Sequence, residues 1–196
     1  MKIATWNVNG IRAREAQVLE LVSRERPDVL CLQEIKAPPS RVPASLCELE
    51  GYFCLWHGEN AYSGVGLHVR RDAVAATPAF VHPPFDMETR IAVVELPGAT
   101  IASVYVPNGG KDYAAKLRFI EAILRGGLVD VGRAADPTND ALFTYWAPWR
   151  NLRQRNIGWR IDYVLASESL AARARRCAVL ADFGTSDHAP VVAEFG

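Results

Sequence analysis

The sequence predicts an α/β fold in a single domain that spans residues 1–196. Short apolar runs typical of strands alternate with longer segments of helical periodicity, and clusters of turn-forming residues separate them. No internal repeat, linker or low-complexity segment breaks this alternation. The composition, 49% apolar and 22% charged, is that of an ordinary globular protein with a hydrophobic core.

The first elements expected are a strand at 2–6, a helix at 11–26 and a strand at 29–32. The helix is amphipathic, with Val18, Leu19 and Val22 on one face, and the proline that follows it cannot continue it. The strand at 29–32 is a continuous apolar run, which is typical of a central strand covered on both faces.

The later elements follow the same logic of apolar runs bounded by turn formers. We expect a helix at 113–125, where Leu117, Ile120, Ile123 and Leu124 form one stripe. The strands expected in this part of the chain lie at 65–70, 91–96, 101–106, 160–166 and 191–195.

The overall charge gives no support for a polyanionic partner. Lysine and arginine together number 22, and so do aspartate and glutamate, so that the formal net charge is zero. Any affinity for nucleic acid must therefore come from local clusters of cations on the contact face.

The cysteines, Cys31, Cys47, Cys54 and Cys177, do not stand at a C-x-x-C spacing. A zinc site is therefore not expected, and we interpret the cysteines as small buried hydrophobes.

The amino-terminal residues have no signal-peptide pattern, and no apolar stretch approaches the ~20 residues of a membrane span. We therefore expect a cytoplasmic protein that does not bind membranes.

Polar side chains recur within or just beyond the apolar strands, where an α/β sheet gathers a site. They are Asn7, Glu34, Tyr105, Asp162 and the run Ser186-Asp187-His188. Taken singly, each has an ordinary structural interpretation: a glutamate after a strand is usually a solvated charge, and a lone histidine is usually structural.

Together with their neighbours, these residues form five segments that resemble the motifs of exonuclease III-type AP endonucleases, in the same order along the chain. The family belongs to the endonuclease/exonuclease/phosphatase superfamily. The matching segments are Thr5-Trp6-Asn7-Val8-Asn9-Gly10-Ile11-Arg12, residues 27–36 around Gln33-Glu34, Val104-Tyr105-Val106-Pro107-Asn108-Gly109, residues 158–165 around Arg160-Ile161-Asp162, and Ser186-Asp187-His188-Ala189-Pro190-Val191.

The resemblance implies a two-sheet α/β sandwich and a DNA-repair enzyme that hydrolyses phosphodiester bonds beside abasic sites or at 3′ ends. The implied cofactor is Mg²⁺, with Mn²⁺ as a possible substitute, and the implied partner is double-stranded DNA bound by a monomer. A cation is needed because negative charge develops on the phosphate oxygens during attack by water.

The resemblance also assigns roles residue by residue. Glu34 would be the main metal ligand, since hard oxygen donors suit Mg²⁺. The metal set it implies is Glu34, Asn7, Asp187 and His188, and the catalytic set is His188, Tyr105, Asp162 and Asn7. His188 would contact the scissile phosphate, with Asp162 orienting its ring and favouring its protonated form. The family varies between amide and carboxylate at the position of Asn9.

A dense aromatic and basic segment contains Trp146, Trp149 and Trp159 together with Arg150, Arg153, Arg155 and Arg160. The resemblance implies that Tyr145, Trp159 and Ile161 shape a pocket for an extruded abasic sugar, with Arg160 beside them. The arginines would contact the flanking phosphates. The alternative is that the tryptophans belong to the core and the arginines form a solvated face.

One motif of the family does not occur in this chain. The family carries Gly-Asp-x-Asn at the end of a central strand, whereas this chain has no Gly-Asp dipeptide and passes from Arg125 through Gly126-Gly127 directly into Leu128-Val129-Asp130. We expect an internal deletion near 125–127 that shortens the sheet. The aspartate would activate the attacking water, and its replacement by Asp130, Asp136, Asn139 or Asp140 has no support from their context.

Three functional hypotheses follow from the sequence. The first is an AP endonuclease and 3′-exonuclease, with activity that the deletion has lowered or removed. The second is a catalytically inactive relative that still binds DNA. The third is a phosphoesterase of the same fold that acts on RNA or on a phosphorylated lipid or sugar, although Trp159-Arg160-Ile161-Asp162 resembles the DNA-repair branch.

Overall fold

The computed structural model describes residues 1–107, 110, 112–125 and 127–196, and its largest sheet contains six strands in the order β10-β11-β1-β2-β4-β3. A second sheet has the order β5-β6-β7, and β8 pairs with β9. The strands are β1 (Lys2–Asn7), β2 (Val29–Gln33), β3 (Tyr52–His57), β4 (Val65–Arg70), β5 (Ala79–Val81), β6 (Ile91–Leu96), β7 (Ala99–Val104), β8 (Val129–Asp130), β9 (Leu165–Ala166), β10 (Ala174–Val179) and β11 (Val191–Phe195).

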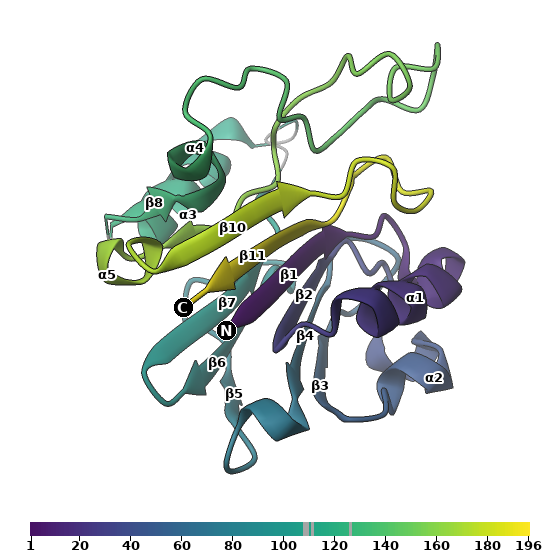
Figure 1. The fold of residues 1–196 in the computed structure, drawn as a ribbon. Helices are drawn as coiled ribbons and strands as arrows, with labels where there is room; N and C mark the ends of the chain where they lie inside the picture. The colour runs from purple at the N-terminus through teal and green to yellow at the C-terminus, as the bar shows by residue number, and fades with distance from the viewer. Residues whose placement is uncertain (108–109, 111, 126) are drawn as a thin grey trace.

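The helices lie outside the sheets, as Figure 1 shows. Helices α1 and α2 cover one face of the large sheet, and α3, α4 and α5 gather near β8. The helices are α1 (Glu15–Glu25), α2 (Ala44–Cys47), α3 (Tyr113–Leu124), α4 (Val131–Ala135) and α5 (Glu168–Ala171), with short 3₁₀ turns at Ile11–Arg14, Pro39–Arg41 and Arg71–Ala73.

The large sheet has two buried faces because most side chains of its central strands are apolar and buried. Along β1, Ala4 and Trp6 pack toward α1, whereas Ile3 packs toward the second layer. All five residues of β2 are buried. This alternation follows from the two-residue period of a strand, which directs successive side chains to opposite faces.

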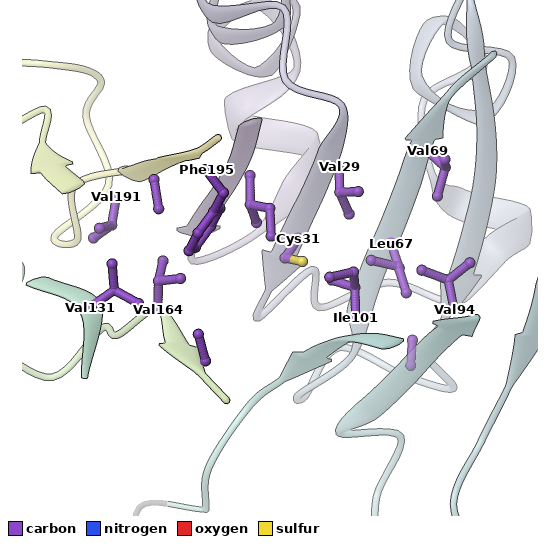
Figure 2. Packing of buried hydrophobic residues seen from close by; sticks show 14 of the residues in the cluster. Val29, Cys31, Leu67, Val69, Val94, Ile101, Val131, Val164, Val191 and Phe195 are labelled. Carbon is purple, nitrogen blue, oxygen red and sulfur yellow. The ribbon is translucent and has the colours of Figure 1, made fainter. Parts of the chain in front are cut away.

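The second layer packs against the opposite face of the large sheet and consists of two separate pieces among the described residues. Figure 2 shows the apolar cluster between the layers, with Val131 and Val164 near Val191 at one end and Ile101 near Cys31 farther along it. Val131 and Val164 belong to the β8–β9 region, and Ile101 belongs to β7. The two pieces therefore cover different parts of one face.

A buried polar contact joins the layers between these apolar side chains. The Gln33 amide donates to the Ser103 hydroxyl at 3.1 Å, and that hydroxyl donates to the Leu32 carbonyl at 3.2 Å. Because buried polar atoms are costly when unpaired, this contact also fixes the lateral position of β7 over β2.

Residues far apart in the sequence meet at the middle of the large sheet. Strand β1 pairs in parallel with β2 and antiparallel with β11, so that Thr5 lies between Cys31 and Val191. Figure 1 shows the start of β1 and the end of β11 side by side. This arrangement places the turn after β1 next to the turn before β11.

The α/β class and the two-sheet sandwich are confirmed, and the strands predicted at 65–70, 91–96 and 191–195 have the predicted bounds. The helix predicted at 11–26 begins as a 3₁₀ turn and ends at Glu25, where Arg26 adopts a left-handed conformation (φ 43°). The prediction missed β3, β5, β8 and β10. Strands β3 and β10 are the two edge strands of the large sheet, and β5 and β8 are only three and two residues long.

The strand predicted at 160–166 is wrong over most of its length, because only Leu165–Ala166 is a strand. The backbone N–H groups of Ile161 and Asp162 both donate to the Thr144 hydroxyl at 3.0 Å. A side chain therefore takes the place of a partner strand, and the backbone bends around it.

Cysteine burial agrees with the sequence interpretation. Cys31 is buried, and burial raises the pKa of its thiol to about 12, although a hydrogen bond with Ser103 opposes this shift. The other three cysteines are partly buried, and all four are free thiols.

None of the helices in the described residues has the length and apolar character needed to cross a bilayer.

Candidate active site

The first part of the site lies where the parallel strands β1 and β2 end. The Asn7 amide donates to Glu34 Oε1 at 2.8 Å, and the N–H of Asn9 donates to the Asn7 amide oxygen at 3.1 Å. Parallel strands place their carboxyl ends at one edge of a sheet, which is why residues 27 positions apart meet here.

The turns that carry these side chains have an unusual backbone conformation. Asn9, Glu34 and Lys36 have positive φ angles of 44°, 51° and 51°. This region is rare for residues with a Cβ, above all for long side chains such as Glu and Lys. Hydrogen bonds from Gly10 to the Glu34 carbonyl at 2.8 Å and from Lys36 to the Ser63 carbonyl at 2.9 Å hold the turns. Such conformations often mark functional sites.

A chain of polar contacts connects Glu34 to Asp187. The Lys36 ammonium lies 2.8 Å from Glu34 Oε2 and donates to the Asn9 amide oxygen at 2.5 Å. The Asn9 amide in turn donates to Asp187 Oδ1 at 2.9 Å. Both carboxylates and both asparagines of this region therefore belong to one network.

The second part of the site is the turn before β11, and the interior of the protein anchors it directly to β1. The Ser186 hydroxyl donates to the Asn7 carbonyl at 2.8 Å and accepts the N–H of His188 at 3.2 Å. The Trp6 indole donates to the His188 carbonyl at 3.1 Å. All four residues are buried, so this junction holds His188 at a fixed position relative to Asn7.

His188 and Asp162 form a buried dyad. His188 Nδ1 lies 2.8 Å from Asp162 Oδ2, and both side chains are largely shielded from solvent. Burial alone would lower the pKa of His188, but the hydrogen bond and charge of Asp162, with Asp187 and Glu34 nearby, raise it above its ordinary value. The dyad therefore favours the imidazolium form.

The ionisation of Glu34 and Tyr105 is coupled. Burial tends to raise the pKa of Glu34, yet hydrogen bonds from Asn7, Lys36 and Tyr105 lower it below its usual value. Burial and the neighbouring Glu34 carboxylate raise the pKa of Tyr105 well above its usual value. At neutral pH the site thus holds an ionised carboxylate and a protonated phenol in contact. The Arg90 guanidinium lies over the Tyr105 ring, 4.7 Å from its centroid.

An aromatic surface borders His188. The Tyr145 ring lies 4.8 Å from the His188 ring and stacks on Trp159 at 5.7 Å with an interplanar angle of 18°. Trp159 is 60% exposed, and Ile161 is 51% exposed. Large apolar side chains left open to solvent in this way commonly mark a binding surface. Trp146, by contrast, is buried, so the core alternative holds for that tryptophan.

Two of the arginines in this segment are already occupied by intramolecular contacts. Arg153 donates to the carbonyls of Ala181 and Phe183 at 2.7 and 2.8 Å, and to those of the two turn residues Gly184 and Ser186. Arg160 donates to both carboxylate oxygens of Asp130, at 2.6 and 2.5 Å. The structure thus directs Arg160 toward Asp130, and Arg153 holds the turn before His188.

The carboxylates considered as replacements for the absent aspartate also have local partners. Asp130 is bound by Arg160 and accepts the N–H of Arg133 at the start of α4. Asp136 accepts the Asn139 amide at 2.8 Å. Neither residue joins the network around Glu34 in the described part of the chain.

A hollow lined by cationic side chains adjoins the network. Its lining includes Arg12, Lys36 and Arg41 together with Glu59 and Asn60. Lys36 belongs to both the hollow and the network, so this surface connects positive charge directly with Glu34. It supplies the local clustering of cations that a chain of zero net charge needs for contact with a polyanion.

The donor set of the network fits a hard divalent cation. Glu34 is held ionised, and Asp187 adds a second carboxylate, which are ligand types of Mg²⁺. Asn7 would add an amide oxygen only after its amide turns, because its NH₂ group donates to Glu34 and its oxygen accepts the Asn9 N–H. Lys36 places a positive charge against the same carboxylate. A bound cation would therefore be held by Glu34 with Asp187 and Asn7, and Lys36 would have to turn away from Glu34.

Comparison with known proteins agrees with this geometry. The profile of the endonuclease/exonuclease/phosphatase family matches residues 4–130, about two thirds of the chain. The chain belongs to that family. Members of the endonuclease/exonuclease/phosphatase family are enzymes by their name, and the matched range includes Asn7, Glu34 and Tyr105.

Curated relatives within this family are DNA-repair nucleases by name. The chain is 26% identical to an exodeoxyribonuclease of Bacillus subtilis, with 97% of this chain and 98% of that protein covered. It is also 26% identical to the DNA repair nuclease APEX1 of Danio rerio, with 97% of this chain and 81% of that protein covered. It spans only 37% of recombination repair protein 1 of Drosophila melanogaster, again at 26% identity.

Solved structures of the family share the fold. A 3′-5′ exonuclease from Neisseria meningitidis superposes with a TM-score of 0.82 at 28% identity, covering 100% of this chain and 99% of that one. An AP endonuclease from Archaeoglobus fulgidus reaches a TM-score of 0.87 at 24% identity, with the same coverage. A related Neisseria 3′ phosphatase, 28% identical, was solved with a product DNA hairpin.

The structure brings most of the predicted site residues together, but not all of them. Asn7, Glu34, Tyr105, Asp162, Asp187 and His188 lie in one network or in direct contact with it, and Tyr145 and Trp159 adjoin His188. Ile161 is exposed on the same segment, whereas Arg160 points to Asp130. Asn108 and Gly109 of the tyrosine motif, and Gly126 in the expected gap, lie outside the described residues.

Sequence reasoning assigned no role to Lys36, Ser186 or Thr144, which connect the parts of the site. Lys36 and Ser186 stand inside matched segments, next to residues that were assigned, so their position was a usable signal. Thr144 lies in no motif, and its hydroxyl contacts depend on a bend that only the structure reveals.

Proposed function

We propose that this protein is a DNA-repair phosphodiesterase that hydrolyses DNA beside abasic sites or at 3′ ends with a divalent cation. The observation that carries the proposal is the junction at Ser186, which fixes the His188–Asp162 dyad against the Asn7–Glu34 pair. In this proposal, the His188 imidazolium and the Glu34 carboxylate are the positive and the negative catalytic group of one common site. We also propose that it acts as a monomer in the cytoplasm.

In this proposal, His188 binds the scissile phosphate. Asp162 favours the imidazolium form and fixes Nδ1, which leaves the other ring nitrogen to donate to a phosphate oxygen. A charged donor held in this way is already oriented toward charge that develops during attack, and such preorganisation is the main source of electrostatic catalysis.

Glu34 holds the cation, with Asp187 and Asn7 completing an oxygen-donor set. When bound, Mg²⁺ or Mn²⁺ neutralises negative charge on the phosphate oxygens. Tyr105 remains a neutral donor because its pKa is raised, and its hydroxyl, which is hydrogen-bonded to Glu34, would turn to the phosphate or to the leaving oxygen.

The aromatic surface selects the substrate. Tyr145 and Trp159 stack beside His188, and Ile161 extends the apolar surface. An apolar surface of this kind would favour a deoxyribose without its base over an intact nucleotide. The cationic hollow at Arg12, Lys36 and Arg41 would hold the phosphate backbone on the other side of Glu34.

We further propose that the chain lacks the strand that carries Gly-Asp-x-Asn in the family. The alignment with the Bacillus exodeoxyribonuclease extends over 251 residues, although this chain has only 196, which requires long gaps on its side. The gap would lie between β7 and β9. Among the described strands, β7 pairs only with β6, and β9 pairs only with β8. Loss of a general base lowers a rate by roughly 10²–10⁴-fold, so weak activity is expected.

The test is a nicking assay on a duplex with a single abasic site, with and without Mg²⁺. The parent should nick slowly in a Mg²⁺-dependent manner, and Glu34→Gln should remove this activity. Glu168→Gln, which changes an exposed glutamate away from the site and from the cationic hollow, is the matched control and should keep the parental rate. Parental nicking no faster than that of Glu34→Gln would refute the active-enzyme proposal.

A second candidate is a DNA-binding relative without activity, which the exposed aromatic surface favours. It predicts that the chain binds abasic duplex without cutting it, with an affinity that falls as salt rises. Trp159→Ala should weaken this binding by roughly 10-fold or more, since stacking contributes ~1–3 kcal/mol per base. Equal affinity of parent and Trp159→Ala would exclude the aromatic surface as the binding site.

A further inference from the structure

A second group of ligand-type side chains lies outside the network around Glu34. His57, His82 and Asp86 each offer one ligand atom, and these atoms all lie within 4.8 Å of one another. His57 ends β3, His82 follows β5, and Asp86 lies in the loop that leads to β6. The three residues therefore come from different elements and meet only in the folded chain.

The donors are already oriented by surrounding contacts. His82 Nδ1 lies 3.1 Å from the Ile91 carbonyl, which can only accept, so Nδ1 carries the proton and Nε2 keeps the lone pair. Asp86 Oδ1 accepts the N–H groups of Arg90 and Ile91 at 2.9 and 3.0 Å, which leaves Oδ2 to face His57 Nε2 at 2.7 Å. Such outer contacts typically fix the ligands of a metal site.

The two imidazoles of this group lie against each other. The ion pair with Asp86 involves only His57, yet the His82 ring stacks on His57 with centroids 3.9 Å apart and an interplanar angle of 21°. Ligands of a tetrahedral zinc ion lie about 3.3 Å apart, given bond lengths of ~2.0–2.1 Å. Binding would thus require the exposed His82 ring to tilt away from the stack, while Asp86 and His57 separate slightly.

We propose that His57, His82 and Asp86 form a second cation site that takes Zn²⁺ or a similar transition metal. Two imidazoles and one carboxylate are the ligand set of three-coordinate protein zinc sites, which leave the fourth position to water. Mg²⁺ prefers oxygen donors alone, so the two sites of this protein would differ in metal. This proposal departs from the expectation that the chain has no zinc site, because that expectation considered only cysteine spacing.

The location suggests a structural role for the bound ion. His57 pairs with Val65, and Val65 pairs with Gln33, so the site lies at the same end of the large sheet as Glu34. Asp86 also holds the backbone of Arg90, whose guanidinium covers the Tyr105 ring. An ion at this site would hold the loop between β5 and β6 and, through Arg90, steady the wall of the active site beside Tyr105.

The test uses Co²⁺ as a spectroscopic probe on metal-free protein, with Mg²⁺ in excess to compete at Glu34. The parent should bind one equivalent of Co²⁺ with the visible absorption of tetrahedral nitrogen and oxygen ligation, without thiolate charge transfer. His82→Gln should weaken Co²⁺ binding by more than about 10–100-fold, which is the loss expected when a residue that only supports a metal ligand is changed. Because His82 is exposed, this substitution should leave the fold intact, which circular dichroism checks.

Two controls separate this site from the others. Cys54→Ser, on the same strand as His57, and Glu34→Gln should both bind Co²⁺ as the parent does. Zn²⁺ should also raise the Tm of the parent but not that of His82→Gln, since a ligand that binds only the folded state stabilises it. Absence of Co²⁺ binding by the parent, or equal binding by His82→Gln, would overturn the proposal.

Discussion

The two layers of the sandwich differ in continuity. The large sheet is unbroken from β10 to β3, and its central strands are buried on both faces. The second layer consists of β5-β6-β7 and of the short pair β8–β9, which share no ladder among the described residues. Both pieces nevertheless pack on one apolar cluster with the large sheet (Figure 2).

This difference bears on the proposed mechanism, because the proposed site residues are divided unequally between the two layers. Asn7, Glu34, Asp187 and His188 all stand at strand ends or turns of the large sheet, and they form a network. Asp130 and Asp162 belong to the segment that includes the short pair, and only Asp162 reaches the site. In the proposed mechanism, the groups for phosphate and cation binding therefore stand mainly on the continuous sheet, whereas the group that would activate water belongs to the layer that is divided.

The largest effect should come from restoring the proposed missing strand. Insertion of a family segment with Gly-Asp-x-Asn between Leu124 and Leu128 should raise abasic-site nicking by roughly 10²–10⁴-fold, because it returns a general base. Single-turnover assays measure this rate. The same insert with its aspartate changed to alanine is the control. Equal rates for both inserts would mean that the water is activated elsewhere.

The next effect concerns the dyad that joins the two layers. Asp162→Asn should lower the rate by about 10²-fold, as expected when a charged donor loses its orientation. Because the pKa of His188 is raised in the parent, the active imidazolium form persists as pH increases and is lost above that pKa. In Asp162→Asn this loss should occur at lower pH, as followed by pH–rate profiles and NMR titration of His188.

The same dyad makes a pH-dependent contribution to stability. A raised folded-state pKa stabilises the protein fully below the unfolded-state pKa of about 6.5, and this contribution disappears as pH rises through the folded-state value. The exposed Asp182→Asn variant should show neither the altered rate profile nor this change. An unchanged profile in Asp162→Asn would remove Asp162 from the proposed mechanism.

A smaller effect is expected at the junction within the large sheet. Ser186→Ala leaves the Asn7 carbonyl and the His188 N–H without their buried partner, which should cost about 1–3 kcal/mol. Urea unfolding measures this free energy. Ser169→Ala, on an exposed helix, should be close to neutral. A neutral Ser186→Ala variant would show that water replaces the hydroxyl and that the junction is less rigid than the geometry indicates.

The smallest effect is a difference in local stability between the layers. Val69→Ala and Val131→Ala remove equivalent methyl groups from buried sites, each at about 1–3 kcal/mol. Val69→Ala should accelerate hydrogen exchange throughout the large sheet, whereas Val131→Ala should act mainly on β8 and β9. Mass spectrometry of exchanged peptides distinguishes the two. If both variants accelerated hydrogen exchange over the same strands, the divided layer would unfold together with the continuous one.

The sequence predicted the central strands well because their apolar runs leave little ambiguity. The runs at Val29–Leu32 and Val65–Arg70 can only be satisfied by burial on both faces. Strand β3 was missed because it lies at the edge of the sheet, where Phe53 and His57 are only partly buried. The burial of an edge strand depends on the elements that cover it, and the local periodicity of its sequence does not predict those contacts.

The site was predicted from motifs rather than from physical pattern, and the limits follow from that. The motifs identified which side chains meet, such as Glu34 with Asn7, but not the contacts that hold them. Arg160 stands in a motif and yet pairs with Asp130, which the resemblance did not imply. Lys36 and Thr144 form side-chain hydrogen bonds between separate turns, and the spacing of residues in the sequence does not predict such contacts.

The pairing of β1 with β11 has a consequence for partial synthesis products. A chain that stops before residue 186 would lack Asp187 and His188, and it would leave one edge of β1 without its neighbour. Such a fragment would carry Glu34 and the cationic hollow but not His188. The proposed phosphate-binding group would therefore be absent until the last residues of the chain have been made.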